Sequence, residues 1–313
     1  MGRYYVGIDT SAYTTSLAII DDRDTIIADL RIGLTVEEGK RGLRQQEAIF
    51  QHMKNLPTLV GDMVEGVDVS KIKVVSCSSR PRTVEGSYMP VFMVGRGQAL
   101  ILSKILGCNY EEFSHQEGHI GTGMLNSDLG QRDRFISLHT SGGTTELLMV
   151  RNLDKALKID LIGGTLDLNF GQLIDRIGVK VGLPFPCGRE MDKLSQDGNI
   201  LDLQVPISIQ DITWINVSGL ENYFTDLIFK DIYRIEDIFA TLFMTIARIL
   251  YAITIKASAQ YDIGDVLVTG GVSANSIIRK YLESTLNEKG VTTFFPDIKL
   301  CTDNGVGIAY LGK

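Results

Sequence analysis

The chain has 313 residues, a formal net charge of −7, 44% hydrophobic residues and 22% charged residues. This composition is typical of a soluble globular protein, and it excludes a disordered chain and a uniformly basic, nonspecific nucleic-acid binder. The length allows two lobes of ordinary domain size, each with its own core. The four cysteines form no C-x-x-C pair, so neither a zinc ribbon nor a disulfide framework is indicated.

Scattered thiols and the absence of a signal-peptide pattern predict a cytoplasmic protein. The longest apolar run, residues 238–257, carries Arg248 and Lys256. These charges favour a central core helix over a membrane span, so no membrane partner is expected.

In chain order, the first half opens with a hairpin. Short strands are expected at residues 4–8 and 15–20, joined through the polar turn that begins at Asp9. The other elements expected before residue 113 are a helix at 43–64 interrupted near Pro57, a strand at 73–76, a loop at 78–82 and a helix at 93–106.

Three of the four histidines fall between residues 113 and 150. His115 and His119 are four residues apart, so on a helix both imidazoles leave the same face, one turn above the other. A helix can give two nitrogens to one transition metal in this way, although an isolated H-x-x-x-H is more often a pair of half-exposed histidines. The pair is therefore a candidate metal site that needs support from the rest of the chain.

The second half also begins with a hairpin. A strand expected at 135–138 ends at His139 and leads into the turn Thr140-Ser141-Gly142-Gly143, where backbone N–H groups can approach an anion. Such turns more often only join strands. The other elements expected are helices at 170–181 and 236–259, a strand at 266–268, a helix ending at 286, a strand at 294–296 and a last helix that Asp303 or Asn304 could cap.

The two hairpins resemble each other in sequence. Residues 8–20 align without a gap on residues 138–150, an offset of 130 (138 − 8), and Thr, Ser, Thr, Thr and Leu recur at matching places. This indicates a duplicated unit. It predicts an α/β protein of the actin/sugar-kinase/Hsp70 architecture (actin-like ATPase or ASKHA fold), with two duplicated RNase H-like lobes and a cleft between them. The expected lobes are residues 1–130 and residues 131–313, the second with a helical insertion.

Several motifs, in order from residue 7 to residue 310, resemble one known family. They are G-I-D-T-S-x-x-x-T, H-x-E-G-H, S-G-G-x-T, I-D-R near G-L-P-x-P-x-G, G-G-V-S-A-N and C-T-D-N-G. The family is tRNA threonylcarbamoyladenosine synthase, whose bacterial member is called TsaD and which was once labelled a glycoprotease (O-sialoglycoprotein endopeptidase, peptidase M22). The resemblance implies an acyltransferase that moves a threonylcarbamoyl group from threonylcarbamoyl-AMP to N6 of adenosine 37 of tRNA.

The resemblance also implies ligands for this chain. One iron or zinc ion is expected on His115, His119, His139 and Asp303. An adenine nucleotide, threonylcarbamoyl-AMP or ATP, is expected on Ser141, Gly142, Gly143, Asp175, Gly188, Asp192 and Asn275. The donor is already activated, so no catalytic nucleophile is assigned. The implied partners are tRNA and companion proteins of the same pathway, and the oligomeric state stays open.

The sequence departs from the family pattern at several positions. The family's acidic pair falls on Tyr13 and Thr14, a family histidine falls on Thr144, and a glycine falls on Cys187. These changes leave open an alternative, a divergent paralogue that binds nucleotide and metal but serves another carbamoyl transfer or a regulatory role. Two further readings, a metalloprotease and a sugar kinase, have less support, because position 116 is Gln rather than a general-base Glu and only Asp175 could be argued as a kinase base.

Overall fold

A computed structural model describes residues 2–36, 42–153, 156–209 and 211–313 of the chain. The chain divides into two compact units: Met1–Gly130 together with Thr302–Lys313, and Gln131–Cys301. This differs from the expected second lobe, residues 131–313, at its C-terminal end. The physical reason is that the last helix packs on a helix and the central strands of the first unit.

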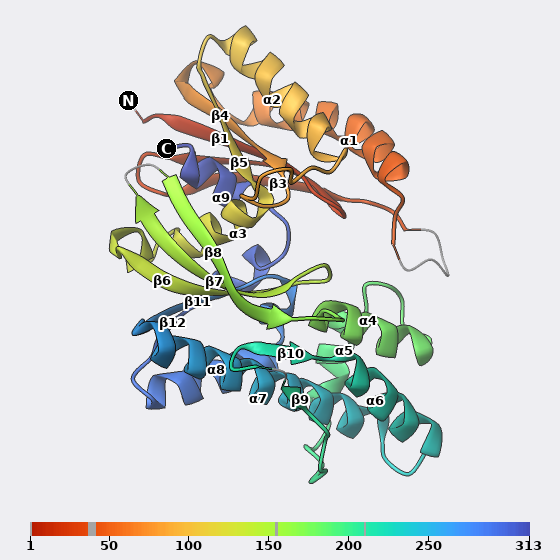
Figure 1. The fold of residues 1–313 in the computed structure, drawn as a ribbon. Coiled ribbons are helices and arrows are strands. Elements are labelled where there is room, and N and C mark those ends of the chain that lie inside the picture. The colour runs from red at the N-terminus through yellow and green to blue at the C-terminus, as the bar shows by residue number, and fades with distance from the viewer. Residues whose placement is uncertain (1, 37–41, 154–155, 210) are drawn as a thin grey trace. The chain divides into compact units, whose positions relative to one another are not determined.

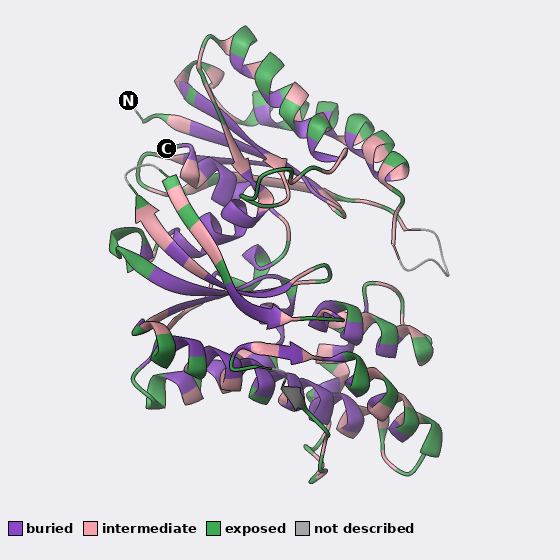
Figure 2. Ribbon diagram, in the orientation of Figure 1, coloured by how far each residue is buried: buried purple, intermediate pink, exposed green. Residues whose placement is uncertain are grey.

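The first unit is a five-stranded sheet in the order β3-β2-β1-β4-β5, with helices on both faces (Figure 1). Its strands are β1 (Tyr4–Thr10), β2 (Thr14–Asp21), β3 (Ile26–Gly33), β4 (Ile72–Arg80) and β5 (Asn109–Ser114). Its helices are α1 (Gln45–Gly66), the 3-10 turn η1 (Val69–Lys71), α2 (Phe92–Leu106), α3 (His115–Met124) and α9 (Val306–Leu311). Because α1 and α2 cover one face and α9 the other, β1 is buried along nearly its whole length (Figure 2).

The second unit is a seven-stranded sheet in the order β12-β11-β6-β7-β8-β10-β9. Its strands are β6 (Arg134–Thr140), β7 (Thr145–Leu153), β8 (Ala156–Thr165), β9 (Ser208–Ile209), β10 (Trp214–Asn216), β11 (Asp265–Thr269) and β12 (Thr292–Phe294). Its helices are α4 (Phe170–Lys180), α5 (Gly188–Ser195), α6 (Ser218–Lys230), α7 (Ile235–Tyr261), η3 (Gly271–Ala274), α8 (Ser276–Glu288) and η4 (Ile298–Leu300); the short turn η2 (Asp128–Gln131) crosses the boundary between the units.

The duplication predicted from sequence is confirmed in the strand register. Thr10 pairs with Thr15 across the antiparallel β1–β2 hairpin, and Thr140 pairs with Thr145 across β6–β7, 130 residues later on both strands (140 − 10 and 145 − 15). A third antiparallel strand follows in each unit, and two parallel strands lie on the other side of β1 and of β6. The two units therefore share one sheet topology, to which the second adds β10 and β9.

The long apolar helix expected at 236–259 is confirmed as α7. Among the described residues it is the one helix long and apolar enough to cross a membrane, and 72% of its most apolar window is buried inside the protein. It packs against α5 and α8 in the largest hydrophobic cluster of the second unit. Burial of this kind is that of a core helix.

Two expected interruptions were wrong. Helix α1 runs without a break through Pro57, because the proline removes only one hydrogen bond and the freed carbonyl belongs to Met53, whose side chain is exposed. The loop expected at 78–82 is still strand as far as Arg80, since β4 pairs there with β5.

Helices α3 and α9 pack so closely that glycine is required between them. A Cβ built on Gly307 of α9 would lie 1.8 Å from the carbonyl oxygen of Gly118 and 2.4 Å from the hydroxyl of Thr122, both on α3. This contact fixes the start of α9 against the start of α3. It thereby holds residues that are far apart in sequence at one place in the first unit.

Candidate metal centre

Helix α3 begins at His115, directly after strand β5. Ser114 caps it: the Ser114 hydroxyl accepts a hydrogen bond from the Glu117 amide at 3.1 Å, and the Glu117 carboxylate accepts one from the Ser114 amide at 2.6 Å. This reciprocal capping box fixes the first turn of the helix. As the spacing predicted, His115 and His119 leave the same face, with ring centroids 4.6 Å apart.

Asp303 reaches the two histidines from the loop before α9. Its neighbour Asn304 accepts hydrogen bonds from the amide of Val306, at 2.9 Å, and from the hydroxyl of Thr122 on α3, at 3.2 Å. Gly305 occupies the N-cap position of α9, and of the two expected capping residues it is Asn304 whose side chain accepts from the first amide of the helix. This leaves the Asp303 carboxylate directed at His115 and His119.

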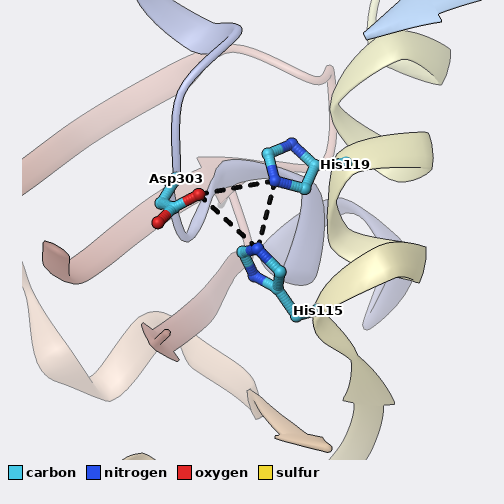
Figure 3. A group of neighbouring side chains, drawn as sticks. All are labelled: His115, His119 and Asp303. Carbon is cyan, nitrogen blue, oxygen red and sulfur yellow. Dashed lines mark hydrogen bonds and ion pairs between the residues drawn. The ribbon is translucent and has the colours of Figure 1, made fainter. Parts of the chain in front are cut away.

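The three side chains converge on one point (Figure 3). The two Nε2 atoms lie 3.2 Å apart, and each lies 3.5 Å from Asp303 Oδ1. Ligand atoms in a tetrahedral zinc or iron site, each about 2.0–2.2 Å from the ion, are separated by about 3.4 Å. The triangle formed by these atoms thus matches one face of such a tetrahedron, and within the described residues it is a group of metal-binding type.

The end of strand β1 contacts two of the three ligands. Asp9 Oδ1 lies 3.0 Å from His115 Nδ1, and the hydroxyl of Ser11 donates to Asp303 Oδ2 at 2.9 Å. Ser11 is itself held by His52 of α1, whose Nε2 donates to the Ser11 carbonyl at 2.7 Å. These contacts leave His115 Nε2 and Asp303 Oδ1 directed at the shared point. His52 therefore has a structural role, because it holds Ser11, which in turn contacts Asp303.

The carboxylates of Asp9 and Asp303 shift the pKa values of the groups around the candidate metal centre. Burial acts to lower the pKa of His115, but the charges of Asp9 and Asp303 outweigh burial and raise that pKa well above its usual value. Burial acts to raise the pKa of Asp303, but hydrogen bonds to both imidazoles hold it well below its usual range. Burial, together with the positive charge of His115, lowers the pKa of His119.

These residues fit a divalent cation. Asp9 is completely buried, and its Oδ2 has no hydrogen-bond partner among the residues that the structure describes. The buried carboxylate of Asp9 and the half-buried carboxylate of Asp303 carry two negative charges, which a divalent ion between neutral imidazoles would balance. Imidazole and carboxylate ligands suit iron or zinc. The three protein ligands of this unit leave a fourth tetrahedral position for a further ligand.

We expect zinc affinity at this site to fall as the solution is acidified. Because the pKa of His115 is raised, the metal-free imidazole holds a second proton, on Nε2, to a higher pH than usual. That proton must leave before Nε2 can bind the ion, while Nδ1 keeps its proton for Asp9. One displaced proton corresponds to a loss of about tenfold in affinity per pH unit. Chelator-competition titrations from mildly acidic to neutral pH measure this slope, and equal affinities across the range would contradict it.

The fourth expected metal ligand, His139, lies in the second unit. It is buried near the end of β6, opposite Glu146 in the β6–β7 pairing. Its role as a ligand stays a prediction. The turn that follows, Ser141-Gly142-Gly143, abuts the start of α4, since the Gly171 amide donates to the Ser141 carbonyl at 3.2 Å. The Phe170 amide donates to the Thr145 hydroxyl at 3.0 Å, so the first two amides of α4 are engaged within the protein, and the phosphate site at the turn stays a prediction.

The other residues expected to bind the nucleotide take part in two hydrogen bonds of the second unit, one at Asp175 and one at Asp192. Asp175 on α4 accepts from the Cys187 amide at 2.8 Å, next to Gly188 at the start of α5. Asp192 on α5 accepts from the Asn275 side chain at 2.7 Å. Helix α4 contacts both α5 and η3, so the two hydrogen bonds lie around one helix. Burial is the main cause that raises the pKa of Asp175, and the Cys187 hydrogen bond only partly offsets it.

Reasoning from sequence missed Asp9, Ser11 and Ser78 as supports of the metal centre. The sequence alone predicts a turn at Asp9 and Ser11 and a loop at Ser78. One available signal is that Asp9 directly follows the run Tyr4–Ile8, which has no charged residue, and a carboxylate in such a strand must find a partner. The capping pattern at Ser114 and Glu117 was also readable from the sequence.

Solved structures share the fold of this chain. HypF from T. kodakarensis matches with a TM-score of 0.64 and 13% identity over 99% of this chain and 47% of its own length, so this chain spans about half of that protein. Component A of the Acidaminococcus fermentans (R)-2-hydroxyglutaryl-CoA dehydratase matches with a TM-score of 0.53 and 15% identity over 99% and 97% of the two chains. At these identities the likeness concerns the fold, which is that of the actin-like ATPases, as predicted.

Sequence comparison identifies the family. Residues 32–310 match the family model of TsaD, tRNA N6-adenosine threonylcarbamoyltransferase. The enzyme of that name from Sulfurihydrogenibium is 30% identical over 98% of this chain and 89% of its own length. The enzyme from Thermosipho africanus is 28% identical over 98% of this chain and 92% of its own length. The chain therefore belongs to the tRNA N6-adenosine threonylcarbamoyltransferase family.

Proposed function

We propose that the protein transfers a threonylcarbamoyl group from threonylcarbamoyl-AMP to N6 of adenosine 37 of tRNA. The observation that carries this proposal is the convergence of His115, His119 and Asp303 in a chain that matches the transferase family along nearly its whole length.

The metal ion in this proposal is iron or zinc, held by His115, His119 and Asp303, with His139 as the fourth ligand. When bound, the ion would supply a Lewis acid that polarises a carbonyl or steadies a carboxylate of the substrate. Ser11 keeps one oxygen of Asp303 occupied, so this carboxylate offers the ion a single oxygen. Asp9 contacts His115 Nδ1 on the other side of the ring, and Ser78 donates to Asp9.

The nucleotide in this proposal is bound by the second unit. In the Ser141-Gly142-Gly143 turn, Gly142 and Gly143 provide backbone N–H groups for phosphate, whereas the Ser141 amide donates to the Thr144 carbonyl at 2.7 Å. Asp175 provides an acceptor for ribose hydroxyls, and Gly188 leaves open space beside it, since a Cβ there would meet nothing closer than 4.0 Å. The donor carries its own leaving group, so the protein contributes orientation and charge stabilisation.

Substitution Asp175→Ala should weaken binding of an adenine nucleotide by about 1–3 kcal/mol, because the ribose loses a buried acceptor. Calorimetry on the purified protein measures this loss. Asp175→Asn is the matched control for structure, since its carbonyl can still accept from the Cys187 amide. Wild-type affinity in both variants would contradict the assignment of Asp175 to the nucleotide.

The transfer itself is tested by reconstitution. The protein is incubated with tRNA, threonine, bicarbonate, ATP and the adenylate-forming enzyme, and the nucleosides of the digested tRNA are analysed by mass spectrometry. We expect threonylcarbamoyladenosine with tRNA that has adenosine at position 37, and none with a tRNA changed at that base. Absence of product despite bound nucleotide would instead favour the paralogue.

That alternative is favoured by one local feature. Tyr13 and Thr14 stand where family members usually carry an acidic pair, and Tyr13 is 39% exposed in the turn between β1 and β2. This turn also carries Ser11, which contacts Asp303. If transfer is absent, the double substitution Tyr13→Asp, Thr14→Glu should restore it when the missing carboxylates are the cause. A double variant that is still inactive would indicate a different substrate.

The proposed partners are tRNA and companion proteins that make the adenylate, in the cytoplasm. Contacts to tRNA phosphates are proposed for basic residues of the first unit, of which some are engaged within the protein: Arg80, Arg82, Arg96, Lys104, Lys40, Arg41 and Arg44. Arg96 pairs with Glu112 at 2.8 Å and Arg80 with Glu117 at 3.6 Å. Lys104 lies in the last turn of α2, and Arg44 precedes α1. Two others, Lys40 and Arg41, lie outside the described residues.

A further inference from the structure

Asp9 stands out as the buried charge beneath the metal centre that the expected ligand set does not include. It lies near the end of β1, is completely buried, and contacts His115 through Oδ1 at 3.0 Å. The same oxygen accepts a hydrogen bond from the hydroxyl of Ser78 on β4. Burying a carboxylate costs free energy unless it is paired or hydrogen-bonded, and the partners of Asp9 are a metal ligand and the hydroxyl of Ser78.

The contact determines which nitrogen of His115 faces the ion. A carboxylate only accepts hydrogen bonds, so the proton shared with Asp9 must sit on His115 Nδ1. The lone pair of the neutral ring is then confined to Nε2. That atom is the one that lies 3.2 Å from His119 Nε2 and 3.5 Å from Asp303 Oδ1. Asp9 therefore contacts the ligand His115 and does not itself bind the ion.

His115 needs this support more than His119 does. The His115 side chain is 23% exposed, whereas that of His119 is 3% exposed and enclosed by the packing of α3. The Phe92 ring lies near the His115 imidazole, with centroids 6.0 Å apart, but an apolar ring does not distinguish one imidazole nitrogen from the other. The hydrogen bond to Asp9 therefore fixes the χ2 angle of His115, that is, which ring nitrogen faces Asp303 and His119.

We propose that Asp9 is a positioning residue that orients His115 and fixes its Nδ1–H tautomer, so that Nε2 is presented to the metal ion. This inference rests on the metal site proposed above. Partners of this kind, behind a ligating histidine, typically account for about 10- to 100-fold in metal affinity. Ser78 supports Asp9 in turn, and β1 with β4 forms the rigid base of the arrangement.

The test compares zinc affinity of the wild-type protein with that of Asp9→Ala and Asp9→Asn by chelator competition. We expect Asp9→Ala to bind zinc about 10- to 100-fold more weakly, because His115 loses its acceptor. Asp9→Asn keeps a carbonyl oxygen for the Nδ1 proton but not the charge, so its affinity should fall between the two. Thermal denaturation of the zinc-free proteins verifies that the variants are folded.

The matched control is Thr10→Val. Thr10 is the next residue on β1, is also completely buried, and makes two hydrogen bonds, to the Val91 carbonyl at 3.0 Å and from the Gly95 amide at 3.1 Å. Its substitution disturbs the end of β1 without touching a ligand. Zinc affinity should be unchanged in Thr10→Val, even if the protein is less stable. An equal loss in Thr10→Val and Asp9→Ala would overturn the proposal.

A second readout reports the tautomer directly. The chain has four histidines, so the zinc-bound protein labelled with ¹⁵N-histidine gives four imidazole patterns in a long-range ¹⁵N–¹H spectrum. We expect the His115 pattern to show Nδ1 protonated and Nε2 bound to the ion in the wild type, and to lose this preference in Asp9→Ala. The reverse assignment in the wild type would overturn the proposal.

The outcomes separate the two claims. If the wild-type protein binds zinc and Asp9→Ala binds it equally well, the metal site stands and the role of Asp9 is wrong. If the wild-type protein binds no zinc or iron, both the metal site and the role of Asp9 are wrong.

Discussion

Replacing His119 by alanine should lower the affinity for zinc by more than about a hundredfold, a larger effect than that of any outer partner. The imidazole is buried, and its Nε2 is one corner of the triangle with His115 Nε2 and Asp303 Oδ1. Without it two protein ligands from this unit are left, and two seldom hold zinc firmly. Elemental analysis after gel filtration, with chelator competition for the affinity, measures the loss.

The fold should survive this change. His119 carries a lowered pKa and is neutral near neutral pH in the metal-free protein, so no charge is left unpaired when it is removed. The control is Gln116→Ala, which truncates a side chain one residue after His115, on another face of the same helix. Metal content that is the same in His119→Ala as in Gln116→Ala would rule out His119 as a ligand.

Replacing Gly307 by alanine should destabilise the first unit by about 3 kcal/mol, near the upper end of the usual cost of overpacking. The new methyl would lie 1.8 Å from the Gly118 carbonyl oxygen and 2.5 Å from the Thr122 amide nitrogen. Both contacts are with helix backbone, which cannot move aside as a flexible side chain can. Helix α9 must shift away from α3, and Asp303 shifts with it, so metal affinity should fall as well.

Urea denaturation with hydrogen exchange of the α3 and α9 peptides measures this destabilisation. Gly61→Ala in α1 is the matched control, because a Cβ at that exposed helical position meets nothing within 4 Å. There the same substitution should leave stability unchanged or raise it by about 0.5–1 kcal/mol, the helix preference of alanine over glycine. Equal stability of Gly307→Ala and the wild-type protein would show that α3 and α9 can separate without cost.

Much of the fold could be predicted from sequence because duplication is a long-range signal. The matching hairpins of residues 8–20 and 138–150 predicted two units of one topology, and the strand registers agree with an offset of 130 on both strands (140 − 10 and 145 − 15). The end of the second unit could not be predicted in this way. Only tertiary packing brings α9 to the first unit, and its glycine contacts with α3 have no periodic pattern.

The metal centre could be predicted in part. The i, i+4 spacing of His115 and His119 places both on one face of any helix, whereas Asp303 came only from the family resemblance, because no local pattern relates it to residues on α3. Asp9 was missed since a carboxylate in a turn usually faces solvent. Its burial depends on α3 and on β4 together, and a single sequence does not show how these elements meet.

The most direct test of the account is the position of the ion itself. Crystals of the protein grown with zinc or iron should give one anomalous scattering peak about 2.0–2.2 Å from His115 Nε2, His119 Nε2 and Asp303 Oδ1. A strong peak elsewhere, or none at this triangle in protein shown by elemental analysis to contain the metal, would contradict the account.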